Sequence, residues 1–158
     1  TSDDAPPNVL VSLIGVNSMM TCVDWLYSGI LDRHRGLKVI LSEGGAGWLP
    51  YILERAEKAF HDNRIKPNAA IGQAGVADSR PPRQVFAEHM YVCLVDEHFA
   101  LKNLEHIGVD NVLFEGDYPH GDGLWPNNKV YLEKVLAEVP DDDAVKIAST
   151  NLSKILGV

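Results

Sequence analysis

Cysteine is scarce in this chain of 158 residues, in which Cys22 and Cys93 are the only two. They lie far apart in separate apolar runs, so we expect two buried thiols and neither a disulfide nor a zinc pair. The sequence also contains no C-x-x-C, H-E-x-x-H, G-x-S-x-G or EF-hand pattern. These absences argue against redox dithiols, helix-borne zinc proteases, nucleophile-elbow hydrolases and EF-hand calcium sites.

Positive charge is in the minority: 14 Lys and Arg stand against 22 Asp and Glu, which gives a net charge of −8. Nucleic acids and anionic membranes attract basic surfaces, so neither is an expected partner. No apolar run approaches the ~20 residues that a membrane span needs. Residues 1–7 are acidic and proline-rich, unlike a signal peptide, and the missing initiator Met indicates a processed or excised N-terminus. We expect a soluble, cytoplasmic protein.

Apolar residues make up 46% of the chain, enough for a packed core, and they alternate between two patterns. Continuous apolar runs predict buried strands, and apolar stripes at helical spacing predict helices between them. Such alternation indicates an α/β fold with a parallel sheet covered by helices. The predicted strands are 37–42, 90–95 and 109–116, and the predicted helices are 17–34, one from Trp48 to Phe60, 96–107, 127–139 and 144–156.

Two segments do not fit clearly into this division of the chain into strands and helices. Residues 9–16 are apolar throughout; their β-branched content favours a strand, whereas Pro6 and Pro7 just upstream also suit a helix start. Residues 61–83 show no periodicity and predict a loop of unusual length, typical of a binding face. Three strands also leave an unpaired sheet edge, which indicates that the chain is part of a larger unit.

Polar groups follow each predicted strand, where parallel α/β folds place their ligand sites. Asp96 and Glu97 are expected to cap the helix that begins there. Asp117 is different, because glycine precedes it, a proline comes two residues later, and the next helix begins about ten residues on. A carboxylate held at a rigid strand end suits a metal ligand or general base. Glu115 would lie on the same side and share a cation, unless an arginine pairs with either group; His120 is either part of the site or a hydrogen-bonded loop residue.

The segment Glu43-Gly44-Gly45-Ala46-Gly47 precedes a helix and resembles a phosphate cradle in outline. It lacks the Lys-Ser/Thr pair of a P-loop and the full glycine pattern of a dinucleotide-binding turn. The carboxylate of Glu43 would also repel phosphate. The sequence therefore argues against nucleotide binding.

Three segments carry distinctive motifs: 37–50 with Glu54-Arg55, 108–126 and the C-terminal 151–156. Together they resemble the amidohydrolase-related family, the amidohydrolase 2 group of the amidohydrolase superfamily. The resemblance implies a (β/α)₈ TIM barrel of roughly twice this length or more. Residues 1–158 would form its C-terminal half with strands six to eight, and the remainder would lie upstream of residue 1. Residues 9–16 would then belong to the loop and helix after strand five.

The resemblance also implies a divalent metal centre, with zinc as the first expectation. Such centres combine a His-x-His pair from strand one, a histidine from strand five and the aspartate that ends strand eight; here Asp117 alone matches. Glu43 stands where many members have a histidine, which puts its role as acid or base in doubt. Trp48, Trp125 and His120 would line the pocket of a small-molecule substrate, although Trp48 also suits helix–sheet packing. Relatives are often dimers, so a homodimer is a further expectation.

Three functions remain open at this point. The first is a metal-dependent hydrolase in which Asp117 binds the metal and takes a proton from metal-activated water. The second is a metal-dependent, non-oxidative decarboxylase of an aromatic or unsaturated acid. The third is an incomplete half-barrel that is catalytically inactive in isolation, since the chain lacks three of the four implied ligands.

Overall fold

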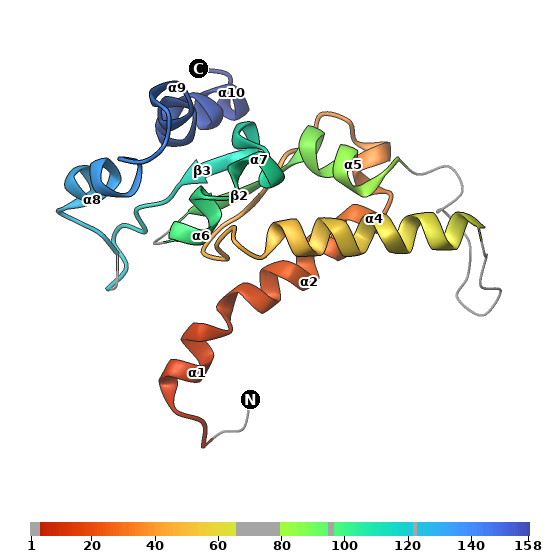
Figure 1. Ribbon diagram of the computed structural model, residues 1–158, viewed down its shortest axis with the longest axis horizontal. Helices are drawn as coiled ribbons and strands as arrows, with labels where there is room; N and C mark the ends of the chain where they lie inside the picture. The colour runs from red at the N-terminus through yellow and green to blue at the C-terminus, as the bar shows by residue number, and fades with distance from the viewer. Residues whose placement is uncertain (1–3, 66–79, 95–96, 122) are drawn as a thin grey trace.

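The computed structural model describes residues 4–65, 80–94, 97–121 and 123–158, which form helices around one small sheet (Figure 1). The strands are β1 (Val39–Leu41), β2 (Met90–Leu94) and β3 (Val112–Phe114). The helices are α1 (Pro7–Ser12), α2 (Ile14–Tyr27), α3 (Ile30–Arg33), α4 (Leu49–Ile65), α5 (Pro82–His89), α6 (His98–Leu101), α7 (Leu104–Ile107), the 3-10 turn η1 (Val109–Asn111), α8 (Asn128–Val135), α9 (Asp141–Val145), the π-helical turn η2 (Lys146–Thr150) and α10 (Asn151–Leu156).

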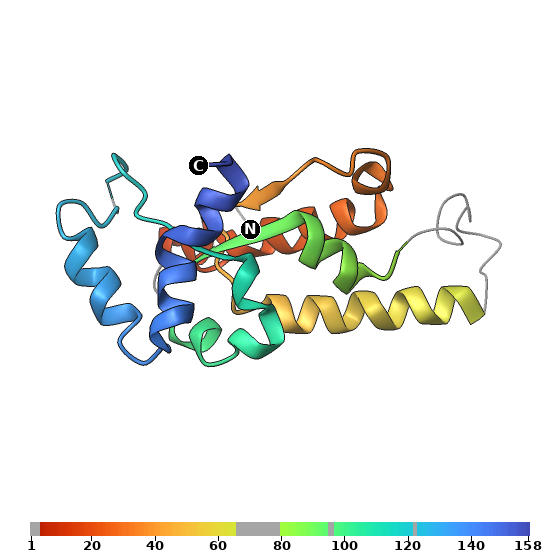
Figure 2. The same ribbon diagram turned by 90° about the horizontal axis from the view of Figure 1, so that it is seen from above.

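All three strands are parallel and stand in the order β1-β2-β3, so the predicted α/β fold with a parallel sheet is confirmed. Val39 aligns with Met90, and Val92 aligns with Val112. Figure 1 shows the sheet between α2 and α4 on one side and α9 to α10 on the other, and Figure 2 shows the same arrangement from above. The central strand β2 is buried along nearly its whole length, which explains why its sequence is apolar throughout.

The N-terminal segment is helical, so the strand interpretation of residues 9–16 is wrong and the helix alternative is confirmed. Pro7 lies in the first turn of α1, where its missing N–H costs no hydrogen bond, and this signal outweighs the β-branched content. The predicted helix 17–34 begins earlier, at Ile14, and breaks at Gly29, which has a φ of 67°.

Two other predicted segments differ from the structure. The loop predicted over 61–83 is shorter within the described residues, because α4 continues to Ile65 and α5 begins at Pro82. The single helix predicted over 96–107 is two short helices, α6 and α7, with Asn103 between them. Asp96, expected to cap that helix, lies outside the described residues.

Helices α1 and α2 together run from Pro7 to Tyr27, a stretch of 21 residues with a mean hydropathy of 1.6. Only 11% of the most apolar 18-residue part of this stretch is buried. Figure 1 shows α1 extending away from the rest of the chain. By length and composition this helix is able to cross a membrane, so the expectation that no segment reaches that length is wrong. One such helix near an N-terminus is a weak indication, since core helices and signal sequences meet the same criteria.

Two buried asparagines join the last strand to its surroundings. The amide of Asn111 donates to the backbone carbonyls of Ala87 at 3.0 Å and Met90 at 2.8 Å. The amide of Asn151 donates to the carbonyls of Val109 at 2.8 Å and Val112 at 2.9 Å. These bonds satisfy carbonyls at the start of β2 and β3, where buried oxygens without a partner would be costly.

We expect Asn111→Ala to lower the free energy of unfolding by about 2–3 kcal/mol, because it leaves buried carbonyl groups without their donor. Urea denaturation followed by circular dichroism measures the change. Asn127→Ala is the matched control: its side chain is exposed and makes no capping bond to α8. A loss at Asn111 no larger than that of the control would contradict this role.

Candidate active site

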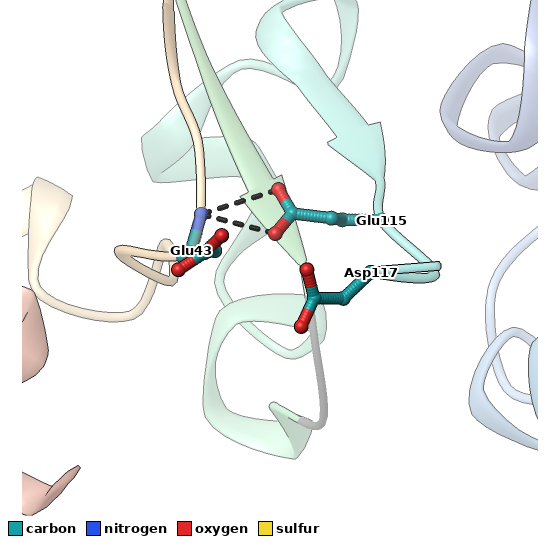
Figure 3. A group of neighbouring side chains, drawn as sticks. All are labelled: Glu43, Glu115 and Asp117. Carbon is teal, nitrogen blue, oxygen red and sulfur yellow. Dashed lines mark hydrogen bonds between the residues drawn. The ribbon is translucent and has the colours of Figure 1, made fainter. Parts of the chain in front are cut away.

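Three carboxylates meet at the edge of the sheet where the parallel strands end (Figure 3). Glu43 follows β1 by two residues, and Glu115 and Asp117 follow β3. One oxygen from each lies within 4.8 Å of the other two. Parallel strands place their carboxyl ends on a common edge, so chain segments about 70 residues apart contribute to one cluster. Glu115 and Asp117 thus lie together, although β3 ends at Phe114 and does not continue as the regular strand on which that expectation depended.

Glu115 joins the end of β3 to the end of β1 through side-chain hydrogen bonds. Its carboxylate accepts the Oγ–H of Ser42 at 2.9 Å and the backbone N–H of Glu43 at 3.1 and 3.2 Å. Cys93 lies in the neighbouring strand β2, with its thiol close to this carboxylate. Burial first, and then the nearby carboxylate, raise the pKa of Cys93 to about 12, so the group remains a neutral thiol. Both cysteines are free and buried as expected.

Glu43 and Asp117 have left-handed backbones, with φ values of 55° and 52°. For residues other than glycine this conformation costs roughly 1–2 kcal/mol, so the surrounding contacts must hold it. At Glu43 the contact is the bond from its N–H to Glu115. At Asp117 the backbone carbonyl accepts the N–H of His120 at 2.9 Å, which closes a turn. These conformations turn both side chains toward the cluster (Figure 3).

His120 lies beside Asp117, with its Nδ1 3.1 Å from the Asp117 Oδ2. The imidazole is 67% exposed, whereas Asp117 is 25% exposed. The structure therefore places His120 next to the predicted ligand while leaving its ring open to solvent. Among the described residues, no arginine or lysine forms an ion pair with Glu43, Glu115 or Asp117. The alternative in which an arginine neutralises this pair of carboxylates thus has no support within the described part of the chain.

The two candidate pocket tryptophans differ in setting. The indole N–H of Trp48 donates to the carbonyl of Gly44 at 2.7 Å, and its ring packs against the core. This is the packing alternative for Trp48. Trp125 is 66% exposed and meets the ring of Tyr118 edge-on, with centroids 5.3 Å apart. Trp125 is therefore the more accessible of the two aromatic surfaces.

Glu97 occupies the glycine loop that follows β1. Its carboxylate accepts the N–H of Ala46 at 2.6 Å and that of Gly47 at 3.3 Å. Gly45 has a φ of 67°, and a Cβ there would lie 2.6 Å from the Glu97 Oε1. The capping prediction for Glu97 is wrong as to its target, because the side chain makes no cap bond to α6 and binds this loop instead. The loop does present backbone N–H groups to an anion, and the carboxylate of Glu97 occupies that position.

The three carboxylates suit a divalent cation. They offer oxygen donors from two strand ends and leave three negative charges close together without a described lysine or arginine nearby. Oxygen-only donor sets favour hard cations such as Mg²⁺, Mn²⁺ and Ca²⁺, and they accept zinc as well. Sequence reasoning placed Asp117 and Glu43 here but missed Ser42 and Cys93. The polar Ser42 directly before Glu43, at the end of an apolar run, was the available signal for the first.

Comparison with known proteins gives one family. A family model described as Amidohydrolase matches residues 17–158. The 6-methylsalicylic acid decarboxylase of Aspergillus aculeatus is 28% identical over 137 residues, which are 83% of this chain and 39% of that protein. An amidohydrolase from Mycobacterium avium subsp. paratuberculosis superposes over 98% of this chain and 36% of its own, with a TM-score of 0.75 and 24% identity.

Two further solved structures have the same fold. The 5-carboxyvanillate decarboxylase of Sphingomonas paucimobilis superposes with a TM-score of 0.66 and 22% identity, over 91% of this chain and 41% of its own. The dihydroxybenzoic acid decarboxylase of Polaromonas sp. JS666 was solved with manganese and 2-nitroresorcinol. It superposes with a TM-score of 0.67 and 20% identity, over 97% of this chain and 47% of its own. The chain thus spans less than half the length of each of these four proteins. By the match over residues 17–158, the chain belongs to the amidohydrolase family.

Proposed function

We propose that this chain is part of a metal-dependent decarboxylase that removes the carboxyl group of an aromatic acid without oxidation. The carrying observation is the carboxylate cluster of Glu43, Glu115 and Asp117 at the carboxyl edge of a parallel sheet. The choice of decarboxylation over hydrolysis follows the relatives, since three of the four proteins compared are decarboxylases of aromatic acids by name.

The architecture we propose is the C-terminal half of a TIM barrel, with residues 1–158 supplying strands six to eight as β1, β2 and β3. Three observations support it: consecutive strands are neighbours, all are parallel, and the relatives are more than twice as long. The remainder of the barrel would precede residue 1 and supply the other metal ligands. A homodimer and a cytoplasmic location stay expectations.

Within the site, Asp117 is the proposed metal ligand, and Glu43 lies near enough to share the ion. A bound divalent cation would hold the substrate carboxylate and withdraw electron density from it. When the C–C bond breaks and CO₂ leaves, a proton must take its place on the ring carbon. The Asp117–His120 pair, 3.1 Å apart, is the proposed source of that proton. The exposed ring of Trp125 offers apolar surface to an aromatic ring.

Two expectations differ about which metal ion the site binds. The resemblance of the sequence favours zinc, whereas the manganese in one relative favours Mn²⁺. Both ions therefore belong in any assay.

Hydrolysis is the second candidate, and the description of the family model favours it. In that reaction Asp117 would accept a proton from an attacking water instead of delivering one to carbon. The two candidates share the same carboxylates, so the reaction catalysed must be decided by assay.

We expect the full-length protein, supplied with Mn²⁺ or Zn²⁺, to release CO₂ from at least one aromatic acid in a panel that includes 6-methylsalicylic, 5-carboxyvanillic and dihydroxybenzoic acids. Removal of the metal with a chelator should abolish the release, because the substrate carboxylate then loses its counter-charge. A coupled CO₂ assay measures it. No release across the panel, together with hydrolysis of amide or lactone substrates, would instead support the hydrolase.

A further inference from the structure

Glu115 differs from the other two carboxylates of the cluster in what its oxygens contact. Oε1 accepts the N–H of Glu43, and Oε2 accepts both that N–H and the hydroxyl of Ser42. Among the described residues, the Oδ2 of Asp117 pairs with the exposed His120 alone. The side-chain carboxylate of Glu43 forms no hydrogen bond or ion pair with any described residue. Both oxygens of Glu115 are thus occupied by the protein itself, whereas Glu43 and Asp117 keep oxygens available to a ligand.

The bonds of Glu115 join strands that are not neighbours. Glu115 follows β3, and Ser42 and Glu43 follow β1, with β2 between them in the sheet. Figure 3 shows its side chain reaching across the end of β2 toward Glu43. The backbone N–H of Glu115 donates to the carbonyl of Leu94, at the end of β2, at 3.1 Å. Glu115 therefore contacts the ends of all three strands.

The contact also maintains an unusual backbone conformation. Glu43 is left-handed, with a φ of 55°, and its N–H points at both oxygens of Glu115. Charged acceptors make stronger hydrogen bonds than neutral ones, so the ionised carboxylate is well suited to hold this N–H. Without it, the backbone at Glu43 would relax toward the right-handed region and carry its side chain away from Asp117.

We propose that Glu115 is a positioning residue: it fixes the backbone of Glu43 so that the Glu43 and Asp117 carboxylates face the same point, and it does not itself bind the metal. The proposal rests on the proposed function insofar as that point holds a cation. Residues that orient metal ligands in this way commonly change metal affinity 10- to 100-fold when removed, by order of magnitude.

The test compares Glu115→Gln with Glu115→Ala in the full-length protein. Glutamine has the same shape; its Oε1 accepts the N–H of Glu43 and its amide donates to the Ser42 hydroxyl, so the frame persists without the charge. Alanine removes the frame. Isothermal titration with Mn²⁺ gives the metal affinity, and hydrogen exchange of the Glu43 amide in the metal-free protein reports the frame without any activity measurement.

For Glu115→Gln we expect both quantities within about threefold of the wild type, since each hydrogen bond of the frame has a substitute. For Glu115→Ala we expect Mn²⁺ to bind roughly tenfold more weakly and the Glu43 amide to exchange roughly tenfold faster. Ser42→Ala removes one donor and should accelerate the exchange less, which keeps the test open if the alanine variant at 115 does not fold. Glu54→Ala, an exposed glutamate on α4, is the control and should change neither.

Two results would overturn the positioning role. If Glu115→Gln binds Mn²⁺ as weakly as Asp117→Asn does, Glu115 is a ligand; if Glu115→Ala leaves the Glu43 amide as protected as in the wild type, no frame exists. Failure of the proposed function looks different: the wild-type protein itself would not bind Mn²⁺, and the exchange measurement on the metal-free protein would still decide whether Glu115 holds Glu43.

Discussion

Asp117→Asn in the full-length protein should lower kcat/KM by about 10²–10⁴-fold, the range expected when a group that acts on the proton transfer is removed. The amide cannot carry negative charge, so it binds a cation weakly and neither accepts nor delivers the proton. The fold should be retained, because asparagine tolerates the left-handed region and the φ of 52° is kept. Steady-state kinetics and thermal unfolding together separate loss of chemistry from loss of structure.

Asp110→Asn provides the matched control for that substitution. Asp110 is 65% exposed, lies just before β3, and pairs with Lys146 on the surface. Surface ion pairs contribute little, so this variant should keep its turnover within about twofold and its unfolding temperature within a few degrees. Near-wild-type turnover by Asp117→Asn would sink the assignment of Asp117 as ligand.

The second large effect concerns residues 1–158 expressed alone, which we expect to bind divalent metal weakly and to turn over none of the panel acids. The resemblance assigns three of the four metal ligands to chain segments outside these residues, and a site with too few ligands holds its ion poorly. Both edges of the sheet, β1 and β3, are also unpaired within the described residues. Elemental analysis after dialysis and the CO₂ assay measure the two outcomes.

Tightly held, stoichiometric zinc on this chain alone would contradict that expectation. The longer protein is the positive comparison, since it should bind metal and react if the proposal of a divided site is right. A His-x-His pair after an apolar strand upstream would support the enzyme, and its absence would support the inactive half-barrel. The two measurements thus decide between the enzymatic proposals and the third alternative.

The sheet was predictable because its signal is local. Each strand is a continuous apolar run that ends at a glycine or polar residue, and each is followed by an apolar stripe at helical spacing, as at Leu49 and Leu53 of α4. Burial on both faces requires such runs, so the parallel arrangement followed from composition. The place of Asp117 just beyond the last strand was predictable for the same reason, whereas its left-handed turn was not.

The features that the sequence could not predict depend on contacts between distant segments. Nothing near Glu97 indicates that its carboxylate binds Ala46 and Gly47 instead of capping its own helix. Likewise, the role of Glu115 depends on Ser42 and Glu43, which only the sheet brings near. In the N-terminal segment two local signals competed, and the helix-starting Pro7 prevailed over β-branched residues of comparable weight.

The carboxylate of Glu97 inside the glycine loop ties the evolutionary fate of two distant positions together. Any side chain at Gly45 would collide with Glu97, and any shorter residue at 97 would leave the N–H groups of Ala46 and Gly47 without their acceptor. A shorter residue at 97 would end the collision but not the left-handed φ of 67° at position 45, which disfavours every residue other than glycine. Glutamate at 97 should therefore occur among relatives only beside glycine at 45, whereas glycine at 45 should persist even where residue 97 is shorter.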